Sequence, residues 1–138
     1  MNYFRSNVVI KDNTTLTIKT GELPAYMAAR KNDIELWVVD IPDTAITKFL
    51  AAQHPECSVA KVTYAQAEPY LRNSLIWEDV NQKVTQKIRE KYSVDEELQM
   101  INRALVNLQD AEFVAYRTYV ATCIQFGDQK KIQLGLKV

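Results

Sequence analysis

Apolar residues recur with helical spacing along the second half of the chain. Ser93 and Glu96 have the spacing of a capping box, and acidic residues fill the turn that follows. Behind this start, an apolar stripe repeats at alternating spacings of four and three: Val94, Leu98, Ile101, Leu105 and Leu108. We therefore expect a helix from Ser93 to about Asn107, with the stripe, Leu105 included, buried in the core of a helical half.

Two further helices are expected on either side of this one. The first runs from about Ser74 to Tyr92, with Ile76, Val80, Val84 and Ile88 spaced by four. The second begins at Asp110, a favourable N-cap residue. One face of that helix carries Phe113, Tyr116, Val120, Cys123 and Ile124. We expect Gly127 to interrupt or end it, because glycine disfavours helix interiors, and Gly135 to be the final stop.

The beginning of the chain has the alternating pattern of strands. Residues 3–10 and 14–20 predict two strands joined by the polar turn at residues 11–13, where Asn13 could take positive φ. In the second strand, Leu16 and Ile18 point one way and polar residues the other. The pattern predicts a hairpin with one face in water.

Four further elements follow before the helical half. Residues 25–30 predict a short helix, and residues 34–39 the strongest strand, apolar on both faces and therefore inside the sheet. Pro42 and Asp43 open a helix that ends near His54, because Pro55 disfavours helical geometry in the residue before it. Residues 58–64 predict another strand.

This order predicts an α+β fold, because strands cluster first and helices last. A β-rich part of about four strands with one or two short helices covers residues 1–70. A bundle of three helices covers residues 71–138. The two parts are either separate domains or one continuous domain.

Composition narrows the classes of partner. The 138 residues include 17 Lys and Arg and 17 Asp and Glu, so the formal net charge is zero. No basic excess marks a nucleic-acid or anionic membrane surface, and no apolar run is long enough to span a membrane. The two cysteines, Cys57 and Cys123, lie far apart, and Cys123 falls on an apolar helix stripe. It is expected to be a buried free thiol, as in a reducing compartment.

The chain contains no recognisable catalytic motif. His54, Glu56 and Cys57 are close in sequence, but a structural zinc site needs four ligands and a Cys–His pair needs a third group. The three glycines form no phosphate-binding loop. We therefore predict no catalytic, cofactor-binding or metal-binding residues and no small-molecule substrate. The basic run Lys83, Lys87, Arg89 and Lys91 is expected to be a solvated helix face, since acidic residues interrupt it.

Tyrosine is the more informative residue type. Of seven tyrosines, Tyr116 and Tyr119 fall on one helix and cannot both face the same core without a wide stripe. Tyrosine is favoured at interfaces, where an apolar ring meets a wet edge. Tyr119 is therefore the residue expected to lie in an intermolecular contact.

Part of the chain resembles small structural proteins of tailed bacteriophages. The likeness covers roughly the last 85 residues. It rests on residues 54–55, 61–64, 69–71, 88–98 and 113–120, on Cys123, and on the ending from Lys130 to Leu136. The resemblance implies a non-enzymatic virion or tail-assembly component, present in multiple copies, bound to other virion or tail proteins and assembled in the host cytoplasm. No functional residue is carried over.

Two other functions remain open. The protein could be a cytoplasmic adaptor or assembly chaperone that binds one partner and is absent from the finished particle. Alternatively, it could be a small enzyme with an unrecognised site around His54 and Cys57.

Overall fold

The protein folds into two compact units. The computed structural model describes residues 1–138. Residues 1–77 and 135–138 form the first unit, and residues 78–134 form the second. The first unit contains a four-stranded antiparallel sheet and the second is helical, so the predicted α+β class is confirmed.

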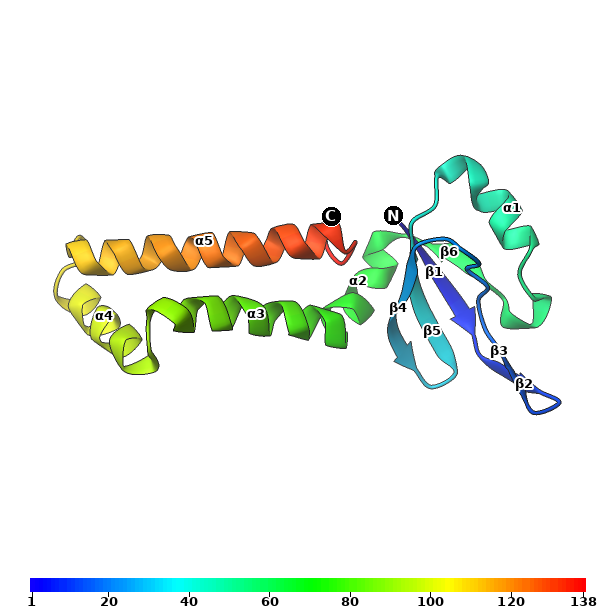
Figure 1. Ribbon diagram of the computed structural model, residues 1–138, viewed down its shortest axis with the longest axis horizontal. Helices are drawn as coiled ribbons and strands as arrows, with labels where there is room; N and C mark the ends of the chain where they lie inside the picture. The colour runs from blue at the N-terminus through cyan, green and yellow to red at the C-terminus, as the bar shows by residue number, and fades with distance from the viewer. The chain divides into compact units, whose positions relative to one another are not determined.

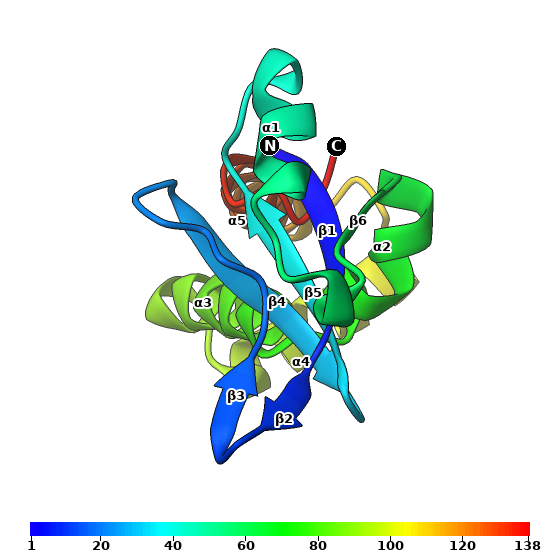
Figure 2. The same cartoon turned by 90° about the vertical axis from the view of Figure 1, so that its right-hand side faces the viewer.

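Four strands form the main sheet of the first unit. They are β1 (Asn2–Asn7), β4 (Ala25–Lys31), β5 (Ile34–Val39) and β6 (Ala60–Val62). All neighbours are antiparallel, in the order β4-β5-β1-β6 (Figure 2). The predicted position of β5 inside the sheet is confirmed. Both faces of this strand are apolar because both are covered by other parts of the protein.

A separate small hairpin joins β2 (Val9–Lys11) to β3 (Thr14–Leu16). Its two turn residues both take positive φ, +50° at Asp12 and +59° at Asn13, as a two-residue hairpin turn requires. The hairpin was predicted, but the single strand expected at residues 3–10 is divided into β1 and β2. The chain leaves the main sheet after Asn7, so β1 pairs with β5 and β6 instead of β3.

The predicted helix at residues 25–30 is wrong, because this segment is β4. Asn32 adopts a φ of +56°, which turns the chain back so that β4 pairs along the whole length of β5. Sheet hydrogen bonds satisfy the backbone here and override the helical preference of alanine and methionine. One irregularity between Met27 and Ala29 leaves Ala28 as an extra residue in the strand.

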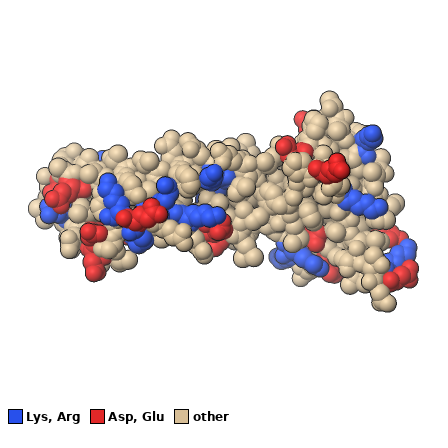
Figure 3. Space-filling view, viewed as in Figure 1, with Lys and Arg blue, Asp and Glu red and all other residues tan.

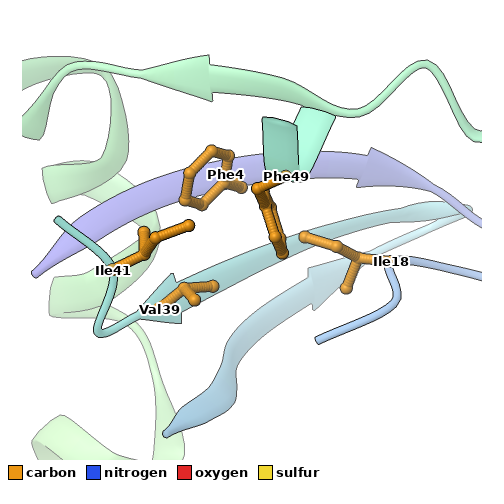
Figure 4. Close-up of a cluster of buried hydrophobic side chains, with 5 residues drawn as sticks. All are labelled: Phe4, Ile18, Val39, Ile41 and Phe49. Atoms are coloured by element: carbon orange, nitrogen blue, oxygen red, sulfur yellow. The ribbon is translucent and has the colours of Figure 1, made fainter. Parts of the chain in front are cut away.

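An apolar cluster covers one face of the sheet (Figure 4). It consists of Phe4, Ile18, Val39, Ile41 and Phe49. The rings of Phe4 and Phe49 lie 4.9 Å apart and tilted by 55°. Phe49 comes from α1 (Ile46–Ala51), which follows a 3-10 turn at Asp43–Ala45. The helix predicted after Pro42 is thus confirmed. A second 3-10 turn, Pro55–Cys57, leads to β6.

The first unit contains one helix that was not predicted, α2 (Tyr64–Arg72). Thr63 and Gln66 form a reciprocal capping box at its start. The helix tolerates Pro69, and Ala67 and Leu71 on it are fully buried. The capping box was the available signal for this helix, since its residues have the T-x-x-Q spacing.

The last four residues belong to the first unit although they follow the helices in sequence. The hydroxyl of Tyr3 donates to the carbonyl of Gly135 at 2.7 Å, and Leu136 is fully buried. Gly135 takes a φ of +71°, and an added Cβ would lie 3.1 Å from Val38 Cγ1. Gly135 therefore ends the preceding helix, as predicted, and lets the chain approach the sheet closely.

Three helices make up the second unit: α3 (Leu75–Lys91), whose first turn belongs to the first unit, α4 (Val94–Val106) and α5 (Ala111–Gln133) (Figure 1). The predicted helices and their starts at Ser93 and Asp110 are confirmed. Tyr119 donates to the carbonyl of Lys87, while Lys131, further along α5, donates to Asn81, earlier on α3. These two contacts make α3 and α5 antiparallel.

The expectation that Gly127 interrupts α5 is wrong. The helix continues to Gln133, and Gly127 is buried inside it. A Cβ placed at residue 127 would lie 2.4 Å from Val84 Cγ2 on α3, far inside ordinary contact distance. Glycine is present because the two helices approach closely there, not because the helix ends.

Candidate interaction surface

The predicted apolar stripe, which is called the α4 stripe because four of its residues lie on α4 and only Leu108 lies in the turn after it, is on the surface of the second unit. The exposed fractions of its residues run from 48% at Ile101 to 80% at Leu105, with Val94, Leu98 and Leu108 between these values. The expectation that Leu105 lies in the core is therefore wrong. The sequence located the stripe correctly but could not show which way it faces.

The stripe is exposed because α4 packs against the rest of the unit through a different face. Met100 is buried, with 9% of its surface exposed, and Glu97 and Ala104 beside it are partly buried. These three residues are spaced by three and four, so they form a second, narrower face that is turned toward α5. The stripe is rotated by about one residue, roughly 100°, from that face and is left in solvent.

The start of α4 is fixed by hydrogen bonds and one ion pair. The Ser93 hydroxyl accepts from the backbone N–H of Glu96, and the Glu96 carboxylate accepts from the backbone N–H of Ser93 at 2.6 Å. Glu97 pairs with Arg89 of α3 at 2.5 Å and accepts the hydroxyl hydrogen of Tyr116 of α5. Glu97 therefore connects all three helices and fixes the rotation of α4.

The contact between Glu97 and Tyr116 shifts the pKa of both side chains. The hydrogen bond from Tyr116, reinforced by Arg89, holds the pKa of Glu97 below its usual value of 4.5. Burial and the neighbouring carboxylate raise the pKa of Tyr116 to about 12. At neutral pH, Glu97 is thus charged and Tyr116 neutral, which is the combination the contact needs.

The end of α4 is tied to the start of α5. Arg103 reaches Asp110 at 3.6 Å and Glu112 at 3.2 Å. Asp110 also caps α5, accepting from the backbone N–H groups of Glu112 and Phe113 at 3.1 Å. Both ends of α4 are therefore anchored within the unit. These contacts fix the position of the helix that carries the exposed stripe.

Tyr119, which is expected to lie in an intermolecular contact, is partly buried and has contacts within its own unit. Its hydroxyl donates to the carbonyl of Lys87 at 2.7 Å, and its ring lies 5.7 Å from that of Tyr92. Tyr92 also meets Tyr116 edge-on at 5.1 Å. Both tyrosines of α5 therefore pack against Tyr92, which lies between α3 and α4 in the chain.

The basic run of α3 is largely engaged within the unit. Lys83 pairs with Asp79 at 2.6 Å, and Arg89 pairs with Glu97. The ammonium groups of Lys87 and Lys91 lie 4.8 Å and 4.7 Å from the ring centres of Phe126 and Tyr119. Positive and negative side chains are interspersed on the face of the molecule seen in Figure 3.

The segment from His54 to Cys57 contains an ion-paired carboxylate and a buried thiol. Lys11 holds the carboxylate of Glu56 at 2.8 Å. Cys57 is fully buried, and burial raises the pKa of its thiol, which disfavours the reactive thiolate. Cys123 is also a buried free cysteine, as predicted. No group of three or more His, Cys, Asp or Glu side chains is placed to hold a metal ion.

Comparison with known proteins gives no relative. No protein-family model, curated protein or solved structure matches the chain. None of its helices combines the length and the apolar character that crossing a membrane requires.

Proposed function

We propose that the protein is a non-enzymatic assembly component that acts through protein–protein contacts, with the α4 stripe as its binding surface. Following the resemblance to phage structural proteins, the proposed setting is a bacteriophage particle, in association with the tail. The partners are other virion or tail proteins. The observation that carries the proposal is the exposure of five aliphatic side chains, four of them on a helix whose ends are anchored and Leu108 in the turn after it.

The size of the stripe supports a binding role. The exposed fractions of its five residues correspond to about three whole side chains. At roughly 60–120 Å² of apolar area for each, the stripe presents roughly 200–350 Å². The upper end of this range reaches about 300 Å², the lower bound for the largest apolar patch on a typical monomer, and such patches are often functional. Single exposed leucines, in contrast, need no explanation. A stable interface covers about 800 Å² per partner, so the stripe would form its apolar centre.

The spacing of the stripe indicates the shape of the partner. Alternating steps of four and three place apolar residues at the a and d positions of a heptad, which is the seam that packs against another helix. The proposed partner segment is therefore an amphipathic helix that lies along α4.

The experiment compares particles carrying the double variant Leu98→Gln/Leu105→Gln with particles carrying Val106→Gln. Val106 is 90% exposed on the same helix but lies outside the stripe, so it is a matched control. We expect the double variant to be lost from purified particles, measured by quantitative mass spectrometry, while Val106→Gln is retained. Circular dichroism should show both variants folded. Equal incorporation of all three proteins, or absence of the unaltered protein from particles and from any partner complex, would refute the proposal.

One observation favours a second function, a cytoplasmic adaptor or assembly chaperone. The apolar stripe occupies only one short helix, and one such surface suits a protein that holds a single partner. The same experiment separates the two functions. An adaptor would copurify with a partner from the host cytoplasm, would lose it in the double variant, and would be absent from finished particles.

A further inference from the structure

A small cavity opens on the sheet of the first unit beside α2. Its volume is about 160 Å³. The floor is aliphatic and comes from the sheet, at Ala29, Ile34 and Leu36. The rim is polar, formed by Arg5 of β1 with Gln66 and Tyr70 of α2.

The register of the sheet explains this combination. Leu36 lies opposite Ala29 on one side and Arg5 on the other, so the three residues form one row across three strands. Ala29 is small, which leaves room beside Leu36. Gln66 and Tyr70 are four residues apart and therefore share one side of α2.

Three solvent-exposed side chains on the rim have donors without an acceptor in the protein. The guanidinium of Arg5 makes no ion pair or hydrogen bond, and the hydroxyl of Tyr70 makes none either. Gln66 uses its Oε1 in the capping box with Thr63, which leaves its Nε2 free. The acidic residue at the wall, Glu35, makes no ion pair with Arg5. Its carboxylate pairs with Arg30 at 3.9 Å and accepts from Trp37 at 2.8 Å and from Thr17.

We propose that this cavity binds a carboxylate carried on a short aliphatic group. The planar guanidinium matches the two oxygens of a carboxylate, and two neutral donors can complete its hydrogen bonding. Leu36, Ile34 and Ala29 accommodate the aliphatic part. A single lining cation suits a monoanion better than a phosphate dianion. The cavity is below the size of sites for large ligands, so the ligand is a small acid or the end of a peptide. The inference does not depend on the proposed function of α4.

The test is an NMR titration of the full chain with isovalerate, and with isovaleramide as the uncharged control. We expect isovalerate at neutral pH, where it is ionised, to shift the Arg5 side-chain and Leu36 methyl signals saturably at millimolar concentrations. Isovaleramide should cause no saturable shift. The absence of saturation with isovalerate, or equal binding of the amide, would overturn the inference.

Two variants and a control identify the residues responsible. Arg5→Gln should weaken isovalerate binding by roughly 10-fold or more, the effect of a lost charge-assisted hydrogen bond. Gln66→Glu should weaken binding equally, because the new carboxylate would pair with the guanidinium of Arg5 in place of the ligand. The substitution should not harm α2, since glutamate is equally suited to this capping-box position. Lys31→Gln removes an unpaired cation from the same sheet face, opposite Ile34 but outside the cavity, and should leave binding unchanged. Unchanged binding in Arg5→Gln and Gln66→Glu would also overturn the inference.

Three short peptides distinguish the possible sources of the carboxylate. One ends in leucine with a free C-terminus, the second is its C-terminal amide, and the third is an amide with an internal glutamate. Binding of the first alone assigns the site to a chain terminus, and binding of the first and third to any acidic peptide. If isovalerate binds and no peptide does, the ligand is a free acid. Binding of the amide alone would contradict carboxylate recognition.

Discussion

Replacing Gly127 with alanine tests the close approach of α3 and α5. Alanine would favour the helix by roughly 1 kcal/mol relative to glycine. The added methyl group, however, would lie 2.4 Å from Val84 Cγ2. Valine is held near one χ1 rotamer in a helix, so this methyl cannot simply rotate away. Overpacking of this kind costs roughly 1–3 kcal/mol. We expect Gly127→Ala to lower the free energy of unfolding by roughly 0–2 kcal/mol.

A second substitution reverses the expected sign. In the Val84→Ala background the clashing methyl is gone, and the next neighbours, Val84 Cβ and Val80 Cγ1, are at the ordinary contact distances of 3.8 Å and 3.9 Å. Gly127→Ala should then stabilise by roughly 1 kcal/mol, because only its helix propensity remains. The coupling between the two sites should be roughly 1–3 kcal/mol.

The measurement is a double-mutant cycle by urea unfolding, followed by far-UV circular dichroism. Hydrogen exchange of the α5 amides assigns the effect to the second unit. Stabilisation by Gly127→Ala alone, or the same effect in both backgrounds, would refute the close helix approach as the reason for this glycine.

Three further predictions concern the contacts that hold α4 and α5. Ser93→Ala should lower stability by about 1 kcal/mol in urea unfolding, while Ser93→Asp keeps the cap. Tyr119→Phe should cost about 0.5–1.5 kcal/mol by the same assay, because it removes the hydrogen bond to the carbonyl of Lys87 and keeps the ring. Because the folded protein lowers the pKa of Glu97, the stability from this group is present above its ordinary pKa of 4.5 and is lost as pH falls through the lowered value. Urea midpoints measured against pH should show this loss, and Glu97→Gln should remove that component.

The sequence alone determined the elements whose signals are local. Ser93 with Glu96, Asp110 and Gly135 set helix ends because a cap depends only on neighbouring residues. The inner strand β5 was evident because a strand covered on both faces must be apolar on both. The α+β class followed from the order of these elements.

Tertiary structure decided what depends on distant neighbours. Residues 25–31 form a strand because β5 supplies their hydrogen-bond partners, and Gly127 continues its helix because Val84 lies against it. The sequence located the α4 stripe but not its exposure, because the rotation of α4 is set by Arg89 and Tyr116 through Glu97. The cavity at Arg5 had no sequence signal, since it exists only where β1 meets β5 beside α2. Local spacing therefore fixes where apolar and polar faces lie, and only long-range packing decides which of them remain in solvent.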